Sequence, residues 1–261
     1  MFFKLKKEWQ MVLVTIFLIC TIFLWVRPWL PAEWFFDLVL IDDMFVFSEH
    51  SLRVFRTLAY ANTLICFVFL CLLLRGTKQD LLMIVAYFFI VIADFFLVRN
   101  IDVVGLQTVG VTAFLIAQLF FMKRLHINCS NRVKIIDIVL RVVVSVVVLA
   151  IAIPLLGDLF APLYFVVAIY ISNLAMNVVL GIINFKKHPT LSIGLICLFL
   201  CDIAVGFQFR GQAWLGIVFP MDVAWLFYGP AKILIVLSLL HKQTKAESES
   251  VFKNEKTKSL L

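Results

Sequence analysis

Two aspartates lie in the middle of long apolar runs, where no water is available to solvate a carboxylate. Asp94 follows IVAYFFIVIA, and Asp202 follows LICLFLC. A charged side chain at the centre of a membrane span costs at least about 2.5–3.5 kcal/mol, so such residues are functional candidates by default. Each aspartate comes fifteen or sixteen residues after a lysine, Lys78 or Lys187. Both carboxyl groups are therefore expected at one depth, about 23 Å from the inner charges.

If the helices that carry them face one another, Asp94 and Asp202 form a buried pair. Burial and a like-charged neighbour both favour the protonated form, so one carboxyl group is expected to hold a proton while the other ionises. Such a pair supplies an acid and a base, which makes both residues catalytic candidates. The alternative is that each aspartate bonds separately to a neighbouring helix and only holds helices together.

Other ionisable residues interrupt the apolar runs near the C-terminus and in the middle of the chain. Asp137 and Arg141 are four residues apart, and we expect them to pair with each other and to snorkel to the interface. Tyr228 and Lys232 share one face of a helix that also contains Asp222. Lys232 could neutralise a carboxylate, hold a phosphate or snorkel; the first two roles make Tyr228 and Lys232 substrate-binding candidates.

A polar stripe follows one face of the apolar segment 160–184. Its members recur at three- and four-residue spacings: Tyr170, Asn173, Asn177, Gly181 and Asn184. Carboxamides at this period either form interhelical hydrogen bonds or line a polar cavity. On the second interpretation, Tyr170, Asn173 and Asn177 bind substrate.

The composition predicts the elements that must position these residues. Of 261 residues, 64% are hydrophobic and only 15% are charged, which excludes a water-soluble globular protein. We expect an all-α, polytopic membrane protein with eight transmembrane helices. The predicted spans are 11–27, 54–74, 80–98, 103–122, 135–156, 160–184, 190–209 and 218–240.

The distribution of basic residues predicts the orientation in the membrane. With a cytoplasmic N-terminus, sixteen of the 23 Lys and Arg residues lie on the inner side and five on the outer side. An even number of spans then places both termini in the cytoplasm, in a plasma membrane or the endoplasmic reticulum. The transmembrane domain covers residues 1–242, and the polar tail 243–261 is predicted to be disordered. The aromatic outer loop 28–53 is expected to lie at the interface.

Several chemistries are excluded by the residue types. The four histidines lie in loops or at span ends, too scattered to form a zinc site with the two aspartates, and we expect neither metal nor cofactor. No nucleophile motif of serine hydrolases and no phosphate-binding loop is present. Nucleic-acid binding is not expected, because the basic residues follow the membrane topology instead of forming a basic face. Five of the six cysteines lie inside apolar runs, which excludes a disulfide framework.

The two regions around Asp94 and Asp202 read alike, each with a basic loop, an apolar span that ends in Asp, a short outer loop and another span. They lie 108 residues apart, which is consistent with two parallel four-helix halves. At these positions the chain resembles the YhhN-type lysoplasmalogenase family from about residue 54 to residue 240. The matching motifs are Ala93-Asp94, the series Gly110, Phe114 and Gln118, then Cys201-Asp202, and Tyr228 followed by Lys232. Gln118 stands where the family pattern has His, and Lys232 where it has Gln.

The resemblance implies hydrolysis of the vinyl ether bond of lysoplasmalogen, a lysophospholipid, to a fatty aldehyde and a glycerophospho-base. It implies Asp94 and Asp202 as the catalytic pair, with Gln118, Tyr228 and Lys232 at the substrate, which reaches the site from the lipid bilayer. A second hypothesis is a proton-coupled transporter or lipid-binding protein that uses the same buried carboxyl groups. A third is a family member that serves as a structural subunit, to which the departures at Gln118 and Lys232 point.

Overall fold

The computed structural model describes residues 7–26, 38–41, 44–47, 49–73, 77–99, 104–127, 129–156, 162–214 and 224–239. Its helices are α1 (Lys7–Val26), α2 (Glu49–Leu72), α3 (Lys78–Asp94), α4 (Val104–His126), α5 (Asn131–Leu156), α6 (Pro162–Ile183), α7 (Pro189–Trp214) and a C-terminal helix, Ala224–Leu239. Each predicted apolar segment therefore contains a helix. The prediction of a helical membrane protein is confirmed.

Four of these helices contain segments that are long and apolar enough to cross a membrane. They are Gln79–Val98, Gly105–His126, Leu163–Ile183 and Pro189–Gly206. Shorter apolar helices of 10–17 residues cover Met11–Phe23, Arg56–Leu72 and Ala224–Leu239. Within the described residues the structure thus shows four candidate spans of the eight that were predicted. Asp222 and the tail 243–261 lie outside the described residues.

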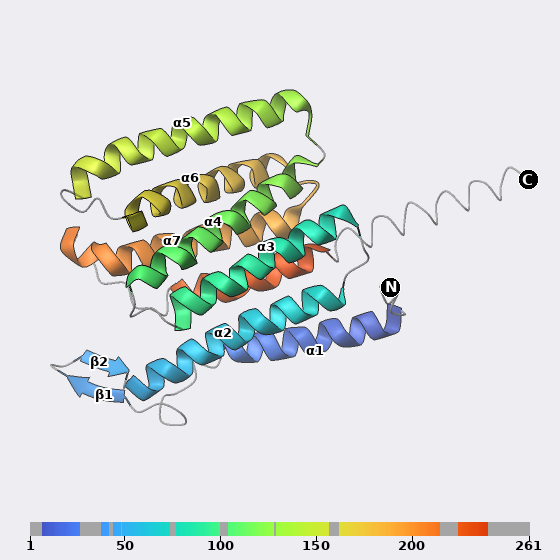
Figure 1. Ribbon diagram of the computed structural model, residues 1–261. Helices are drawn as coiled ribbons and strands as arrows, with labels where there is room; N and C mark the ends of the chain where they lie inside the picture. The colour runs from blue at the N-terminus through green and yellow to red at the C-terminus, as the bar shows by residue number, and fades with distance from the viewer. Residues whose placement is uncertain are drawn as a thin grey trace, which may run out of the picture.

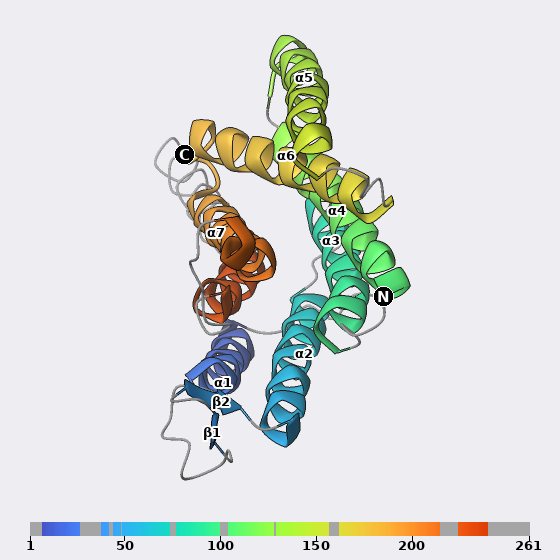
Figure 2. The ribbon, with the colours of Figure 1, turned by 90° about the vertical axis from the view of Figure 1, so that its left-hand side faces the viewer.

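The helices lie side by side in a bundle (Figure 1). Seen from the end, α2, α3 and α4 follow one another along one side, while α7 and the C-terminal helix lie on the other (Figure 2). Helix α6 packs against both α4 and α7, and α5 packs against α6 at the edge of the bundle. The polar stripe of α6 is therefore placed between three neighbouring helices.

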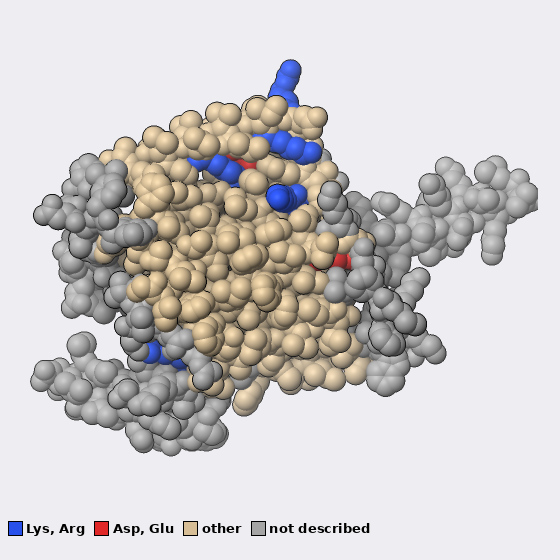
Figure 3. All heavy atoms as spheres, viewed as in Figure 1, with Lys and Arg blue, Asp and Glu red and all other residues tan. Residues whose placement is uncertain are grey.

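Apolar side chains cover the outside of the bundle as well as its interior. On α5 the residues Ile135, Val142 and Val146 each expose 59–63% of their surface. Figure 3 shows a nearly uncharged face, in which most of the visible Lys and Arg lie toward the end where α4 ends and α5 begins and a smaller group lies at the lower left. Exposed apolar patches of this extent are rare on soluble monomers and suit contact with lipid.

A two-stranded hairpin lies inside the segment that was predicted as an interfacial outer loop. Strand β1 (Leu38–Ile41) pairs antiparallel with β2 (Met44–Phe47), so that Leu38 lies opposite Phe47. The segments LVLI and MFVF favour strands, and the intervening Asp42-Asp43 is of a residue type common in turns. Helix α2 begins soon afterwards, at Glu49 and not at the predicted residue 54.

Helix α3 is positioned at both ends by local structure. At its start Thr77 and Asp80 form a capping box, in which each side chain accepts a hydrogen bond of 3.2 Å from the other residue's backbone N–H. At its end the α-helix changes into a π-helix, η3 (Phe95–Arg99), directly after Asp94. Short π-helical segments are frequent at functional sites. This one sets the direction of the chain immediately beyond the candidate carboxylate.

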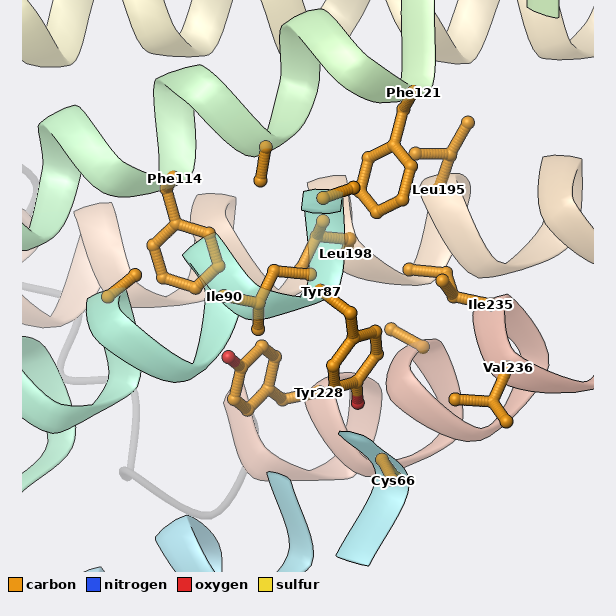
Figure 4. Packing of buried hydrophobic residues seen from close by; sticks show 14 of the residues in the cluster. Cys66, Tyr87, Ile90, Phe114, Phe121, Leu195, Leu198, Tyr228, Ile235 and Val236 are labelled. Atoms are coloured by element: carbon orange, nitrogen blue, oxygen red, sulfur yellow. The ribbon is translucent and has the colours of Figure 1, made fainter. Parts of the chain in front are cut away.

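The core surrounds this region. Figure 4 shows Tyr87, Ile90, Phe114, Leu198 and Tyr228 packed together between α3, α4, α7 and the C-terminal helix. All five are at most 7% exposed. Four helices from two distant parts of the sequence therefore meet at the part of α3 that leads to Asp94.

Candidate active site

Asp94 is completely buried and is surrounded by donors from two other helices. Thr63 of α2 and Tyr228 of the C-terminal helix each donate a hydroxyl hydrogen bond to its carboxylate. The ammonium group of Lys232 forms an ion pair with the same carboxylate, with Nζ 3.6 Å from Oδ2. A carboxylate with two hydroxyl donors and a cation is stabilised in its charged form.

Lys232 is enclosed by this site. Only 1% of the residue is exposed, and Nζ donates to Thr63 Oγ1 at 2.8 Å and to the Ala59 carbonyl oxygen at 3.3 Å. Its Nζ also lies over the rings of Tyr228 and Trp225, at 4.0 and 5.0 Å from their centroids. Of the roles considered for Lys232, the structure favours neutralisation of a carboxylate, and the snorkelling alternative is wrong because Asp94 and Thr63 hold the ammonium group inside.

Asp202 has different surroundings. Tyr170 of α6 donates a hydrogen bond of 2.5 Å to its Oδ2, and the residue is only partly buried. Phe114 of α4 links the two environments, since its ring centroid lies 5.8 Å from that of Tyr170 and 6.5 Å from that of Tyr228. Asp94 and Asp202 thus belong to one region, in which one is enclosed and the other accessible.

The polar stripe of α6 reaches three neighbouring helices. Tyr170 bonds Asp202 on α7, and Asn177 Nδ2 donates to Gln118 Oε1 on α4 at 2.8 Å. Arg141 of α5 donates to Asn173 and to Asn177. These contacts favour interhelical hydrogen bonds over the lining of a polar cavity.

Asp137 and Arg141 form the predicted ion pair, with Arg141 Nε 2.7 Å from Asp137 Oδ2. The prediction that they snorkel is wrong, because each is only 5% exposed. The carbonyl oxygens of Asn173 and Asn177 draw the guanidinium group inward, and His126 Nε2 lies 2.9 Å from Asp137 Oδ2. A second buried polar cluster therefore connects α4, α5 and α6.

Sequence reasoning missed two features of the site, Thr63 and the π-helix. Thr63, which donates to Asp94, was visible as part of a polar pair, Asn62-Thr63, inside an apolar span. The π-helix after Asp94 left no signal that we recognised. Gly110 marks the close approach of α4 to it, since a Cβ there would lie 2.5 Å from Leu97 Cγ.

Metal ligation was considered for the same region. Within the part of the chain that the structure describes, no three His, Cys, Asp or Glu side chains form a group that could hold a metal ion. The polar groups around Asp94 are two hydroxyls and an ammonium, which are hydrogen-bond donors to a carboxylate.

The fold and the site together define a helical membrane protein with two carboxyl groups in one region between its helices, one enclosed and one partly buried. The model of the YhhN family matches residues 54–239, and the chain belongs to this family. That match contains both aspartates and every residue of the Asp94 environment. No curated protein matches the chain, and no solved structure does.

Proposed function

We propose that this protein is a membrane hydrolase that cleaves the vinyl ether bond of lysoplasmalogen-type lysophospholipids. The observation that carries the proposal is the unequal environment of two carboxyl groups that lie in one region of the helix bundle. Asp94 faces an ammonium group and two hydroxyl donors, whereas Asp202 accepts from a single phenol. Membership of the YhhN family supports the same reaction class.

The two environments assign different roles to the aspartates. Asp94 is the carboxylate, because Lys232 compensates its charge at 3.6 Å. Asp202 is the carboxylic acid, because it lies in the same region as the negative Asp94 and its described hydrogen-bond partner is a neutral phenol instead of a cation. The surroundings of the two aspartates thus favour opposite protonation states. This difference is typical of an acid–base pair.

The reaction follows from these two protonation states. The carboxylic acid of Asp202 transfers its proton to the outer carbon of the vinyl ether, and the double-bond electrons form the new C–H bond. The adjacent carbon becomes an oxocarbenium ion, which the carboxylate of Asp94 stabilises. Water adds to that carbon and gives its proton to a carboxylate, as in carboxylate-pair glycosidases. The hemiacetal then divides into a fatty aldehyde and a glycerophospho-base, so water is the only co-reactant.

Substrate contacts are assigned around this pair. Tyr170 and Tyr228 hold the two carboxyl groups and lie next to the reacting atoms. Lys232 acts through Asp94, whose charge it compensates. Gln118 on α4 is a further substrate contact, whereas Asn173 and Asn177 bond Arg141 and hold the neighbouring helices together. The apolar chain of the lipid lies among the surrounding hydrophobic side chains.

We further propose that all eight apolar segments span the membrane as two parallel halves, with both termini in the cytoplasm. The excess of Lys and Arg on the inner side supports this orientation. Reporter fusions at the two termini test it, because a periplasmic or lumenal signal from either end would contradict it.

The test of the hydrolase is aldehyde release from lysoplasmenyl lipids by the purified protein. Asp94→Asn and Asp202→Asn are each expected to abolish release while the protein still inserts and folds. Asp80→Asn is the matched control, since Asp80 lies on the same helix as Asp94 and only caps its start. Wild-type turnover in either active-site variant would refute the assignment. Folded protein that releases no aldehyde but shows pH-driven uptake in proteoliposomes would instead favour a transporter.

A further inference from the structure

A chain of buried polar side chains leads from α5 through α6 to α4 and ends at Gln118. We propose that Asp137, Arg141 and Asn177 are positioning residues that orient the Gln118 carboxamide. Its N–H groups then bind an oxygen of the glycerophosphate part of the lysolipid. This inference rests on the proposed function for the identity of the ligand, whereas the orientation of Gln118 follows from the contacts alone.

The orientation of Asn177 depends first on the direction in which the Arg141 guanidinium group points. Its Nε is held by Asp137 Oδ2 at 2.7 Å, so its two terminal nitrogens point toward α6. A guanidinium group has only donors. The atom of Asn177 that faces Arg141 Nη2 at 2.8 Å must therefore be the carbonyl oxygen Oδ1.

The second step follows for the rest of Asn177. With Oδ1 turned toward Arg141, its amide nitrogen faces α4 and donates to the Gln118 backbone oxygen at 2.9 Å and to Gln118 Oε1 at 2.8 Å. An amide nitrogen is a donor only, so the Gln118 atom that it meets must be Oε1. The orientation of both carboxamides is thus fixed by the charge of Arg141.

The third step concerns the remaining end of Gln118. Its Nε2 is buried and has no hydrogen-bond partner among the described residues, and the whole residue is 0% exposed. Buried N–H groups in native proteins are nearly always bonded to protein, water or ligand. This pair of donors, held in a fixed direction, therefore indicates a ligand acceptor.

The position of Gln118 indicates which part of the lysolipid binds to it. It follows Phe114 by one helical turn, about 6 Å along α4, and the Phe114 ring contacts both Tyr170 and Tyr228. The glycerol and phosphate oxygens of a lysolipid lie within a few ångströms of its vinyl ether. An amide N–H suits the ether and phosphoryl oxygens, which only accept hydrogen bonds, whereas the opposite orientation would present an oxygen to them.

The test exchanges one donor for an acceptor. Asn177→Asp keeps an oxygen toward Arg141 but cannot donate to Gln118 Oε1, so Gln118 must turn and present its oxygen to the ligand. Asn184→Asp is the matched control: it is the same change on the same helix, and Asn184 bonds the Leu180 carbonyl oxygen and Cys129, not Gln118. The probe is 1-O-alkyl-2-lyso-glycerophosphocholine, a saturated ether that can bind but cannot be hydrolysed.

We expect Asn177→Asp to weaken binding of the probe and to raise KM for the vinyl ether by about tenfold or more. For Asn184→Asp, both the affinity for the probe and KM should stay within about twofold of wild type, because this change does not alter the hydrogen bond to Gln118. A tenfold change corresponds to about 1.4 kcal/mol, the size of one hydrogen bond. Gln118→Met, which has no donor, should match Asn177→Asp, and the double variant should lose no more than either single variant. A general disturbance of α6 would also appear in Asn184→Asp, whereas an effect that acts through Gln118 is absent once Gln118 has lost its amide group.

The outcomes separate this inference from the proposed function. Wild-type-like binding by folded Asn177→Asp or Gln118→Met overturns it, and so does an additive loss in the double variant. Binding that depends on Gln118 without any aldehyde release supports it while refuting the hydrolase. A parallel titration with 1-O-alkylglycerol identifies the acceptor: if the dependence on Gln118 persists without the phosphate, a glycerol oxygen is bound, and if it is lost, a phosphoryl oxygen is bound.

Discussion

Replacement of Lys232 by methionine removes the cation that compensates Asp94. Lys232 Nζ lies 3.6 Å from Asp94 Oδ2, and both residues are at most 1% exposed. Two unit charges at this separation interact by about 4–5 kcal/mol at an effective dielectric constant of about 20. Because Asp94 would be left as a buried charge without its partner, we expect Lys232→Met to lower the free energy of unfolding by about 3–5 kcal/mol.

The assay is thermal unfolding in detergent for Lys232→Met, Asp94→Asn and the double variant. The double variant removes both charges, so it should recover most of the stability that Lys232→Met loses. Lys123→Met serves as the control, because Lys123 Nζ lies over the ring of Phe120 at 5.5 Å, on α4. Losses that add up in the double variant would show that Lys232 does not stabilise the protein through Asp94, and would refute the reasoning.

Further predictions concern the partner of Asp202 and the helix packing beside Asp94. Tyr170→Phe removes the 2.5 Å hydrogen bond to Asp202 and should lower kcat about tenfold, as expected for about 1–1.5 kcal/mol; unchanged kcat would argue against Asp202 as the acid. Gly110→Ala places a Cβ 2.5 Å from Leu97 Cγ and should cost about 1–3 kcal/mol of stability. Gly105→Ala, with nothing within 4 Å of the added Cβ, should cost less than Gly110→Ala, and equal unfolding temperatures would contradict the close packing.

The sequence predicts the helices and singles out the two aspartates as site candidates, because both conclusions depend on local patterns of residues. Apolar runs of sufficient length indicate spans without knowledge of their neighbours. An aspartate inside such a run is conspicuous because burial of a charge is costly. The match of the chain to the YhhN family, over residues 54–239, covers both aspartates.

The environments of the aspartates could not be predicted in this way, because they depend on which helices meet. The pairing of Lys232 with Asp94 joins residues that are 138 positions apart, and Thr63 reaches Asp94 from a third helix. Arg141 was expected at the interface because lysine and arginine often snorkel. It lies inside because two asparagines on α6 offer oxygens that compete with water for its guanidinium group.

The most direct test of the acid–base pair is hydrolysis of a lysoplasmenyl lipid in D2O. The aldehyde is trapped as it forms, and its deuterium content is measured by mass spectrometry. If the carboxyl group of Asp202 protonates the outer vinyl carbon, each aldehyde molecule carries one deuterium on the carbon next to the carbonyl. Asp202→Asn should give no product in the same assay. Aldehyde that contains no deuterium, or labelled aldehyde from folded Asp202→Asn, would contradict the mechanism.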